Sequence, residues 1–117
     1  MFSYEKLEVY QKAYNTNHKV YCLLKGNKTI PNYAKNQLGR ASLSIMLNIA
    51  EGSAKFSNKD RRNFYITARG SAFECASLIT FLCDEGEVTI DLKEDLCQSY
   101  QEISRILFTM IQNLTMR

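Results

Sequence analysis

The scarcity of helix-breaking residues constrains this chain more than any other feature. Its 117 residues include one proline and five glycines, so long stretches run without a residue that ends a helix. Apolar residues recur along these stretches at spacings of three and four, which is the period of a helix with one buried face. The pattern predicts four helices, over about residues 4–25, 32–52, 58–85 and 91–114.

Turn and capping residues mark the ends of the predicted helices. Gly26 suits the position just after the first helix, where a left-handed residue is common, and Gly86 suits the end of the third. Pro31 fits the first turn of the second helix. Ser57, followed three residues later by Asp60, predicts the N-cap of the third helix.

The lengths of the helices and loops predict the fold class. Helices of about 20 residues are roughly 30 Å long, and the segments between them are short. Four such helices in succession predict an all-α fold, an antiparallel up-down-up-down four-helix bundle. Residues 1–117 are predicted to form a single domain, since the length and the 45% hydrophobic content suffice for one core.

The first helix carries tyrosines at helical spacing. Its predicted seam consists of Leu7, Tyr10, Tyr14, Asn17, Tyr21 and Leu24. Such a stripe fits either a core face or a platform on which nucleic-acid bases stack. We favour the core, because apolar and aromatic residues at helical spacing more often pack inside a bundle.

The second helix has more apolar residues than one buried stripe requires. Beside its seam of Leu38, Ala41, Ile45, Asn48 and Gly52 it carries a second apolar set. That second set consists of Leu43, Met46, Leu47 and Ala50. A helix that is apolar most of the way round is buried on most sides. A single chain of this size has little depth, so these four residues are predicted to contact other copies of the chain.

Polar residues interrupt the apolar faces of the second and third helices. Asn48 lies on the seam with Glu51 three residues on, and Arg69 and Glu74 flank Gly70 on the third helix. A cluster of this kind fits either acid–base catalysis or a buried polar network that fixes helix register. We favour the network, with Arg69 paired to Glu51 or Glu74. We also expect Gly70 to be approached closely by another backbone or a large side chain.

The charge is divided unevenly along the chain. Residues 1–70 hold twelve Lys/Arg and four Asp/Glu, a balance of +8, whereas residues 71–117 hold three and eight, a balance of −5. The segment 55–65, "KFSNKDRRNFY", interleaves four cations with aromatic residues at the start of the third helix. It fits either a phosphate-binding surface or a solvated basic loop.

Several classes of protein do not fit the sequence. The four cysteines show no C-x-x-C spacing and His18 is the one histidine, so no metal site is predicted. No apolar run is long enough to cross a bilayer, and the N-terminus lacks the apolar region of a secretory signal. We therefore expect a cytoplasmic protein with free thiols, no cofactor and no membrane partner.

Two segments, "GRASLSIMLNIAEGSAK" and "FYITARGSAFE", resemble the signatures of a bacterial four-helix-bundle family encoded in intervening sequences of ribosomal RNA genes. The opening "YEKLEVYQKAY" resembles that family's usual start, so the resemblance covers essentially the whole chain. It implies a ring-like homopentamer with no established enzymatic activity. A similar fold occurs in the accessory protein of diversity-generating retroelements, a basic pentamer that binds nucleic acid and a reverse transcriptase.

The resemblance also marks one position on the second helix. The family usually has two basic residues before the helix's alanine, where this chain has Gly39-Arg40. One of the two positive positions is therefore kept. Together with the basic segment, the residues predicted to contact nucleic acid are Arg40, Lys55, Lys59, Arg61 and Arg62.

Two functions of different classes stay open at this point. The first is a non-enzymatic, pentameric accessory protein that binds RNA or DNA. The alternative is a structural or protein-interaction module without nucleic-acid binding, for which the acidic residues around the last loop offer a surface. Neither function calls for a catalytic residue or a small-molecule substrate, so neither is predicted.

Overall fold

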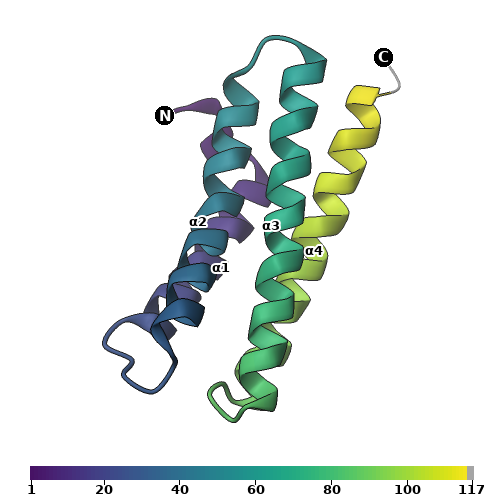
Figure 1. Cartoon of the computed structure of the whole chain (residues 1–117). Coiled ribbons are helices and arrows are strands. Elements are labelled where there is room, and N and C mark those ends of the chain that lie inside the picture. Colours follow the sequence, from purple (N-terminus) through teal and green to yellow (C-terminus); the bar gives the residue numbers. More distant parts are fainter. Residues whose placement is uncertain (116–117) are drawn as a thin grey trace.

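The computed structural model describes residues 1–115 and contains four long helices and one short turn (Figure 1). A 3₁₀ turn, η1, spans Ser3–Lys6. The long helices are α1 (Glu8–Leu24), α2 (Asn32–Ala54), α3 (Asn58–Asp84) and α4 (Ile90–Thr115). No strand occurs within this described part of the chain. The predicted all-α four-helix bundle is therefore confirmed.

The helix ends follow the predicted breaker and capping residues. Gly26 and Gly86 have φ angles of 70° and 82°, the left-handed conformation that glycine adopts without a steric penalty. The Ser57 hydroxyl accepts the Asp60 N–H at 3.1 Å and caps α3. The start of α4 differs slightly from the prediction, because the Thr89 hydroxyl accepts the Leu92 N–H and the helix begins one residue early.

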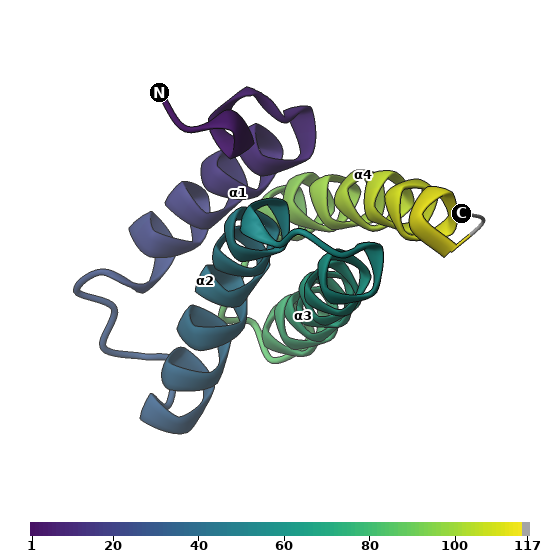
Figure 2. The ribbon, with the colours of Figure 1, turned by 90° about the horizontal axis from the view of Figure 1, so that it is seen from above.

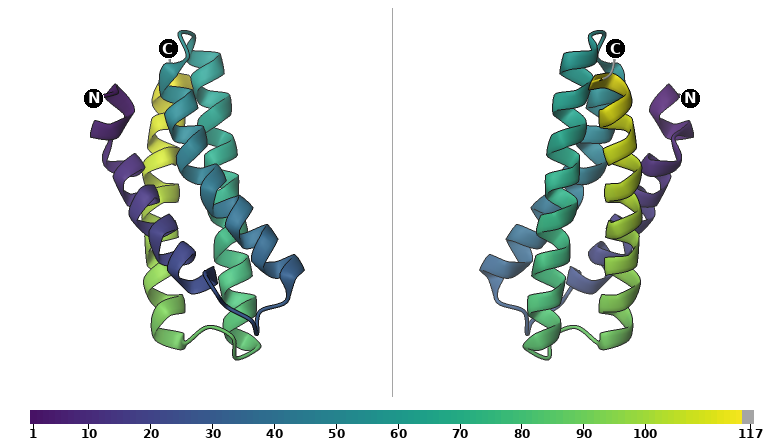
Figure 3. Two further views of the ribbon diagram at one scale, coloured as in Figure 1. Left: turned by 90° about the vertical axis from the view of Figure 1, so that its left-hand side faces the viewer. Right: turned by 90° about the vertical axis from the view of Figure 1, so that its right-hand side faces the viewer.

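The four helices pack in sequence around one core. α2 contacts α1 and α3, and α4 contacts α3 and α1, so α2 lies between α1 and α3 when the bundle is seen from its end (Figure 2). The bundle measures 46 × 25 × 22 Å. Figure 3 shows the α2–α3 loop, the N-terminus and the last turn of α4 at one end and the other two loops at the opposite end. The largest fully buried side chains are Tyr100, Leu38, Ile45, Ile49, Ile79, Leu82, Leu96, Ile103 and Leu107.

The face of α1 that meets the core was predicted only in part. The buried residues of α1 are Val9, Ala13, Thr16 and Val20. Tyr14 and Tyr21 are 55% and 56% exposed. The Thr16 hydroxyl donates to the Lys12 carbonyl at 2.7 Å, so it can be buried at little cost, whereas buried tyrosine hydroxyls would each need a partner. Tyr14 and Tyr21 therefore face outward, whereas Leu7, Tyr10 and Leu24 of the predicted seam pack partly against the core.

Two ion pairs connect α1 to α4. Lys12 Nζ lies 2.8 Å from Glu102 Oε2, and Lys19 Nζ lies 2.7 Å from Asp95 Oδ2. The hydrogen bond to Glu102 raises the pKa of Lys12, and the same bond lowers the pKa of Glu102. Both pairs are partly open to water, so they contribute little to stability. Within residues 1–115 these are the two ion pairs of the structure.

Candidate nucleic-acid and subunit surfaces

The basic segment forms the tight connection between α2 and α3. Arg61 Nε donates to the Lys55 carbonyl at 2.6 Å and so closes the loop. Lys55 Nζ lies 5.0 Å from the centre of the Phe64 ring, a cation–π contact. Lys59 is exposed and Arg62 is half-buried. Lys55 and Arg61 therefore also hold the loop together, while Lys59 and Arg62 are its free cations.

Among the residues that the structure describes, 1–115, no carboxylate pairs with any of these four cations. The two ion pairs in the described residues lie on α1 and α4, far along the chain from the loop. The loop lies at the end of the bundle opposite the acidic α3–α4 loop (Figure 1). The positive charge at this end is therefore available to an outside anion.

Arg40 is separated from the basic loop. It is an exposed residue of α2 and lies 15 residues before Lys55, about 22 Å along a helix that rises 1.5 Å per residue. It borders a shallow hollow on α2 instead. The five predicted nucleic-acid contacts therefore form one cluster of four residues and one isolated cation.

The outer surface of α2 has an apolar centre with a polar rim. Leu43 and Leu47 are 47% and 52% exposed and line a hollow of about 400 Å³. The rim of this hollow consists of Arg40, Ser44, Asn48 and Glu51. Interfaces between proteins share this arrangement. Of the other predicted contacts, Ala50 is half-buried, and Met46 packs partly against the core.

The predicted polar network does not form within the chain. Asn48 Nδ2 donates to the Ser44 carbonyl at 2.8 Å and to its hydroxyl at 2.9 Å. The Ser71 hydroxyl donates to the Ser44 hydroxyl at 2.8 Å and so connects α3 to this group. Asn48, Ser44 and Ser71 thus form one of the polar links between α2 and α3. Ser44 was missed, although a serine one turn before an asparagine is a local hydrogen-bonding signal.

The charged residues predicted to complete that network lie elsewhere. Glu51 is exposed, and Glu74 accepts a hydrogen bond from Gln37. Gly70 has open space beside it, because no described atom beyond its own stretch of helix lies within 4 Å of where a Cβ would be. The close approach occurs at Gly52 instead, where a Cβ would lie 2.7 Å from the Tyr65 ring.

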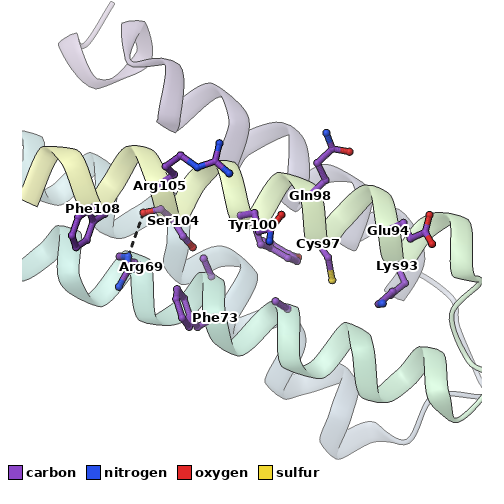
Figure 4. A pocket seen from close by; sticks show the side chains of 13 residues that line it. Arg69, Phe73, Lys93, Glu94, Cys97, Gln98, Tyr100, Ser104, Arg105 and Phe108 are labelled. Carbon is purple, nitrogen blue, oxygen red and sulfur yellow. Dashed lines mark hydrogen bonds between the residues drawn. The ribbon is translucent and has the colours of Figure 1, made fainter.

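Arg69 belongs to a groove between α3 and α4 (Figure 4). Its guanidinium carbon lies 4.8 Å from the centre of the Phe73 ring and 5.3 Å from that of Phe108. Arg69 Nε donates to the Ser104 carbonyl at 3.3 Å. The groove has a volume of about 980 Å³. Arg69 therefore joins two helices by stacking and one hydrogen bond, and not through an ion pair.

Two buried titratable residues belong to the core, Cys75 on α3 and Tyr100 on α4, and Tyr100 also lines the groove. Burial raises the pKa of the Cys75 thiol to about 12, which leaves it protonated at neutral pH. Burial also raises the pKa of Tyr100, whose hydroxyl has no hydrogen-bond partner within the described residues. A protonated thiol is a poor nucleophile, so Cys75 is not activated for covalent chemistry.

Arg69→Met is expected to lower the free energy of unfolding by about 1–2 kcal/mol, because two cation–π contacts are lost while the apolar stem is kept. Loss of a buried ion pair would cost about 3–5 kcal/mol. Urea unfolding followed by circular dichroism distinguishes the two values. The matched variant Arg69→Lys keeps the charge but not the planar stacking group. If both variants lose about 3–5 kcal/mol of unfolding free energy, Arg69 is not held mainly by stacking on the two rings.

Within residues 1–115 no group of three or more metal-ligating side chains comes together. No helix in this part of the chain is long and apolar enough to span a bilayer. Besides the groove between α3 and α4, the four-helix bundle presents the basic loop and the outer face of α2 as candidate binding surfaces.

These features define a four-helix-bundle protein, and the comparisons with known proteins place it in a family. The family model described as 23S rRNA-intervening sequence protein matches residues 5–109. The chain therefore belongs to the 23S rRNA-intervening sequence protein family, as its signature segments indicated.

A solved structure has the same fold. A protein of unknown function from the S23 ribosomal protein family of Bacteroides thetaiotaomicron superposes with a TM-score of 0.83. The two sequences are 24% identical, and the match covers 88% of this chain and 97% of the other. This likeness supports the bundle architecture. The comparison with curated proteins gives no match.

Proposed function

We propose that the protein is a cytoplasmic, non-enzymatic homo-oligomer, a pentamer by family resemblance, that binds nucleic acid through its basic end. The observation that carries the proposal is the group of four cations around the α2–α3 loop, none of which has a carboxylate partner in residues 1–115. RNA and DNA backbones are the polyanions that such a surface attracts.

The outer surface of α2 supports the oligomeric part of the proposal. Leu43 and Leu47 leave about half of their side-chain surface in water in the single chain. Covering them with another copy removes apolar surface from water, which is favourable at about 25 cal/mol per Å². The polar rim around them supplies groups that can bond across a subunit boundary.

Assembly would multiply the charge of the basic loop. In a ring, each group of four cations is repeated around the axis, so the loops form a positive band. Within residues 1–115, Lys59 and Arg62 are the cations of this band whose side chains make no hydrogen bond, ion pair or cation–π contact. Contacts to phosphate carry affinity but little sequence information, so we expect binding without sequence preference.

A charge-reversal experiment tests the proposed nucleic-acid binding. Fluorescence polarisation with labelled RNA and DNA should show binding by the wild type at low salt. The logarithm of the affinity should fall with that of the salt concentration, by about 0.9 for each neutralised phosphate of duplex DNA and about 0.7 for single strands. Lys59→Glu/Arg62→Glu should abolish binding, and Arg61 is left intact because it closes the loop.

The control variant carries the same change in charge at the other end of the bundle. Lys25→Glu/Lys28→Glu lies in the α1–α2 connection, opposite the basic loop (Figure 3). It should keep most of the affinity. Absence of binding by the wild type, or equal loss in both variants, would overturn the basic loop as the contact surface.

The acidic end supports the second candidate, a protein-interaction module. Asp84 and Glu85 are exposed at the end of α3, and neither takes part in the ion pairs of residues 1–115. Glu87 is held in place because it accepts a hydrogen bond from the Thr29 hydroxyl at 2.7 Å. If the wild type does not bind nucleic acid, this surface becomes the better candidate for a partner, which would carry basic side chains.

A further inference from the structure

The groove between α3 and α4 has the same make-up as the hollow on the outer surface of α2. Phe73 and Phe108 line the groove and are 56% and 46% exposed. Charged side chains, among them Arg69 and Arg105, surround these rings (Figure 4). The single chain therefore leaves two separate apolar surfaces in water, which we call the α2 hollow and the α3–α4 groove.

The two surfaces lie on different sides of the chain. Ser71 on α3 points toward α2, since its hydroxyl donates to the Ser44 hydroxyl at 2.8 Å. Residues two apart on a helix are rotated by about 200° around its axis. Arg69 and Phe73, which lie two residues to either side of Ser71, therefore point away from α2. One copy of the chain can thus contact one neighbour through the α2 hollow and another through the α3–α4 groove.

The two surfaces also overlap in height along the bundle. Ser44 borders the α2 hollow, and its bond to Ser71 places it level with the stretch of α3 that carries Arg69 and Phe73. Arg69 in turn reaches the Ser104 carbonyl of α4 at 3.3 Å. In a ring whose copies all point the same way along the axis, two surfaces that meet must lie at similar heights. The α2 hollow and the α3–α4 groove meet this condition.

The charges of the two surfaces run in opposite order. α2 and α4 point in the same direction, toward the end of the bundle that holds the α2–α3 loop (Figure 1). In that direction the α2 hollow leads from Arg40 to Glu51. The α3–α4 groove leads from Glu94, with Lys93 beside it, to Arg105. A neighbour in the same orientation therefore brings Glu51 toward the positive end of the groove, which favours the contact.

We propose that the α2 hollow of one copy packs into the α3–α4 groove of the next copy. A contact between two unlike surfaces is head-to-tail, and it closes into a ring when the rotation between copies allows. A hollow packed against the same hollow of a partner would close at two copies and would leave Phe73 and Phe108 in water. The inference rests on the proposed homo-oligomer and names the surfaces that meet, and it does not depend on nucleic-acid binding.

A mixture of two variants, each damaged at one surface, tests this pairing. Leu47→Asp damages the α2 hollow and keeps the groove, whereas Phe73→Asp damages the groove and keeps the hollow. In light scattering each variant alone should have the mass of one chain. The mixture restores one intact contact between unlike variants, so at high protein concentration it should give a species of twice the 13.5 kDa of one chain.

Further variants separate the contact from effects on the fold. Phe73→Asp removes a stacking partner of Arg69, so Phe108→Asp serves as a second groove variant and should also pair with Leu47→Asp. Phe81→Asp is the matched control, because Phe81 is 49% exposed on α3 and lies outside the groove lining. It should keep the wild-type mass. Circular dichroism should show the wild-type helix content in every variant.

The outcomes distinguish this inference from the proposed assembly. If the wild type assembles and both groove variants keep its mass, the groove is not the partner of the α2 hollow. The pairing is equally wrong if the mixtures stay at the mass of one chain. A wild type that is itself a single chain would instead overturn the proposed homo-oligomer, and the pairing with it.

Discussion

Leu47→Asp is expected to split the assembled protein into single chains. In the isolated chain this side chain is 52% exposed, so an aspartate there costs the fold little. In an assembly that covers the α2 surface, the same carboxylate would lose its water, at a cost of several kcal/mol. A cost of about 3 kcal/mol weakens association more than a hundredfold. Light scattering of the purified variant should therefore report the mass of one chain.

A second aspartate on the same helix provides the control for Leu47→Asp. Tyr33 is 72% exposed in the first turn of α2, where an acidic residue is favoured by the helix dipole. Tyr33→Asp should keep the wild-type mass and stability. If Leu47→Asp assembles normally, the hollow lined by Leu43 and Leu47 is not a subunit contact.

Gly52→Ala is expected to destabilise the fold, although alanine is the better helix former. The added Cβ would lie 2.7 Å from Cε1 of the Tyr65 ring and 3.0 Å from Phe64 Cβ. The Tyr65 ring is buried and its hydroxyl lies 3.2 Å from the Ser53 hydroxyl, so it cannot move aside freely. Overpacking of this kind costs about 1–3 kcal/mol. Urea unfolding should show the loss as a lower midpoint.

Substitution of Gly70 by alanine should instead stabilise the fold. Gly70 lies in the middle of α3 with open space around it, so alanine there gains up to about 1 kcal/mol of helix propensity. When both variants are unfolded in urea, the midpoint of Gly52→Ala should lie below that of the wild type and the midpoint of Gly70→Ala above it. Stabilisation by Gly52→Ala would contradict the close contact between α2 and α3 at that position.

The positions of the helices and turns could be predicted from local residues. The side of α1 that faces the core could not. Gly26, Gly86 and Ser57 end or cap helices through their own backbone or side-chain chemistry, which needs no tertiary information. On α1 two stripes have helical spacing, and periodicity cannot choose between them. The choice depends on the partners, because small residues such as Ala13 let helices approach and tyrosine hydroxyls need water.

The polar residues of α2 and α3 were identified, but their partners were not. Arg69 and Glu74 are five residues apart, which places them about 140° apart around a helix of 3.6 residues per turn. They therefore face α4 and α2 respectively, and cannot pair. Asn48 forms a hydrogen bond with Ser44, one turn earlier on the same helix. To predict these partners, one must know how each helix is rotated about its own axis. That rotation is set by the packing of the helices against one another.

The basic loop shows what sequence can indicate about a surface. The excess of cations in residues 55–62 was visible from the residues alone. Their division into loop-closing and free groups depends on two contacts, the hydrogen bond from Arg61 to the Lys55 carbonyl and the cation–π contact of Lys55 with Phe64. The isolation of Arg40 depends on the length of α2. The positive charge of the segment could be recognised from the sequence alone. Which cations lie together in space could be known only from the fold.

The mass of the wild-type protein in solution tests the proposed assembly most directly. Light scattering coupled to size-exclusion chromatography at micromolar concentration should report five times the 13.5 kDa of one chain. Analytical ultracentrifugation over a range of concentrations should give the same mass. A stable species of 13.5 kDa would contradict the homo-oligomer and, with it, the covered α2 surface and the band of basic loops.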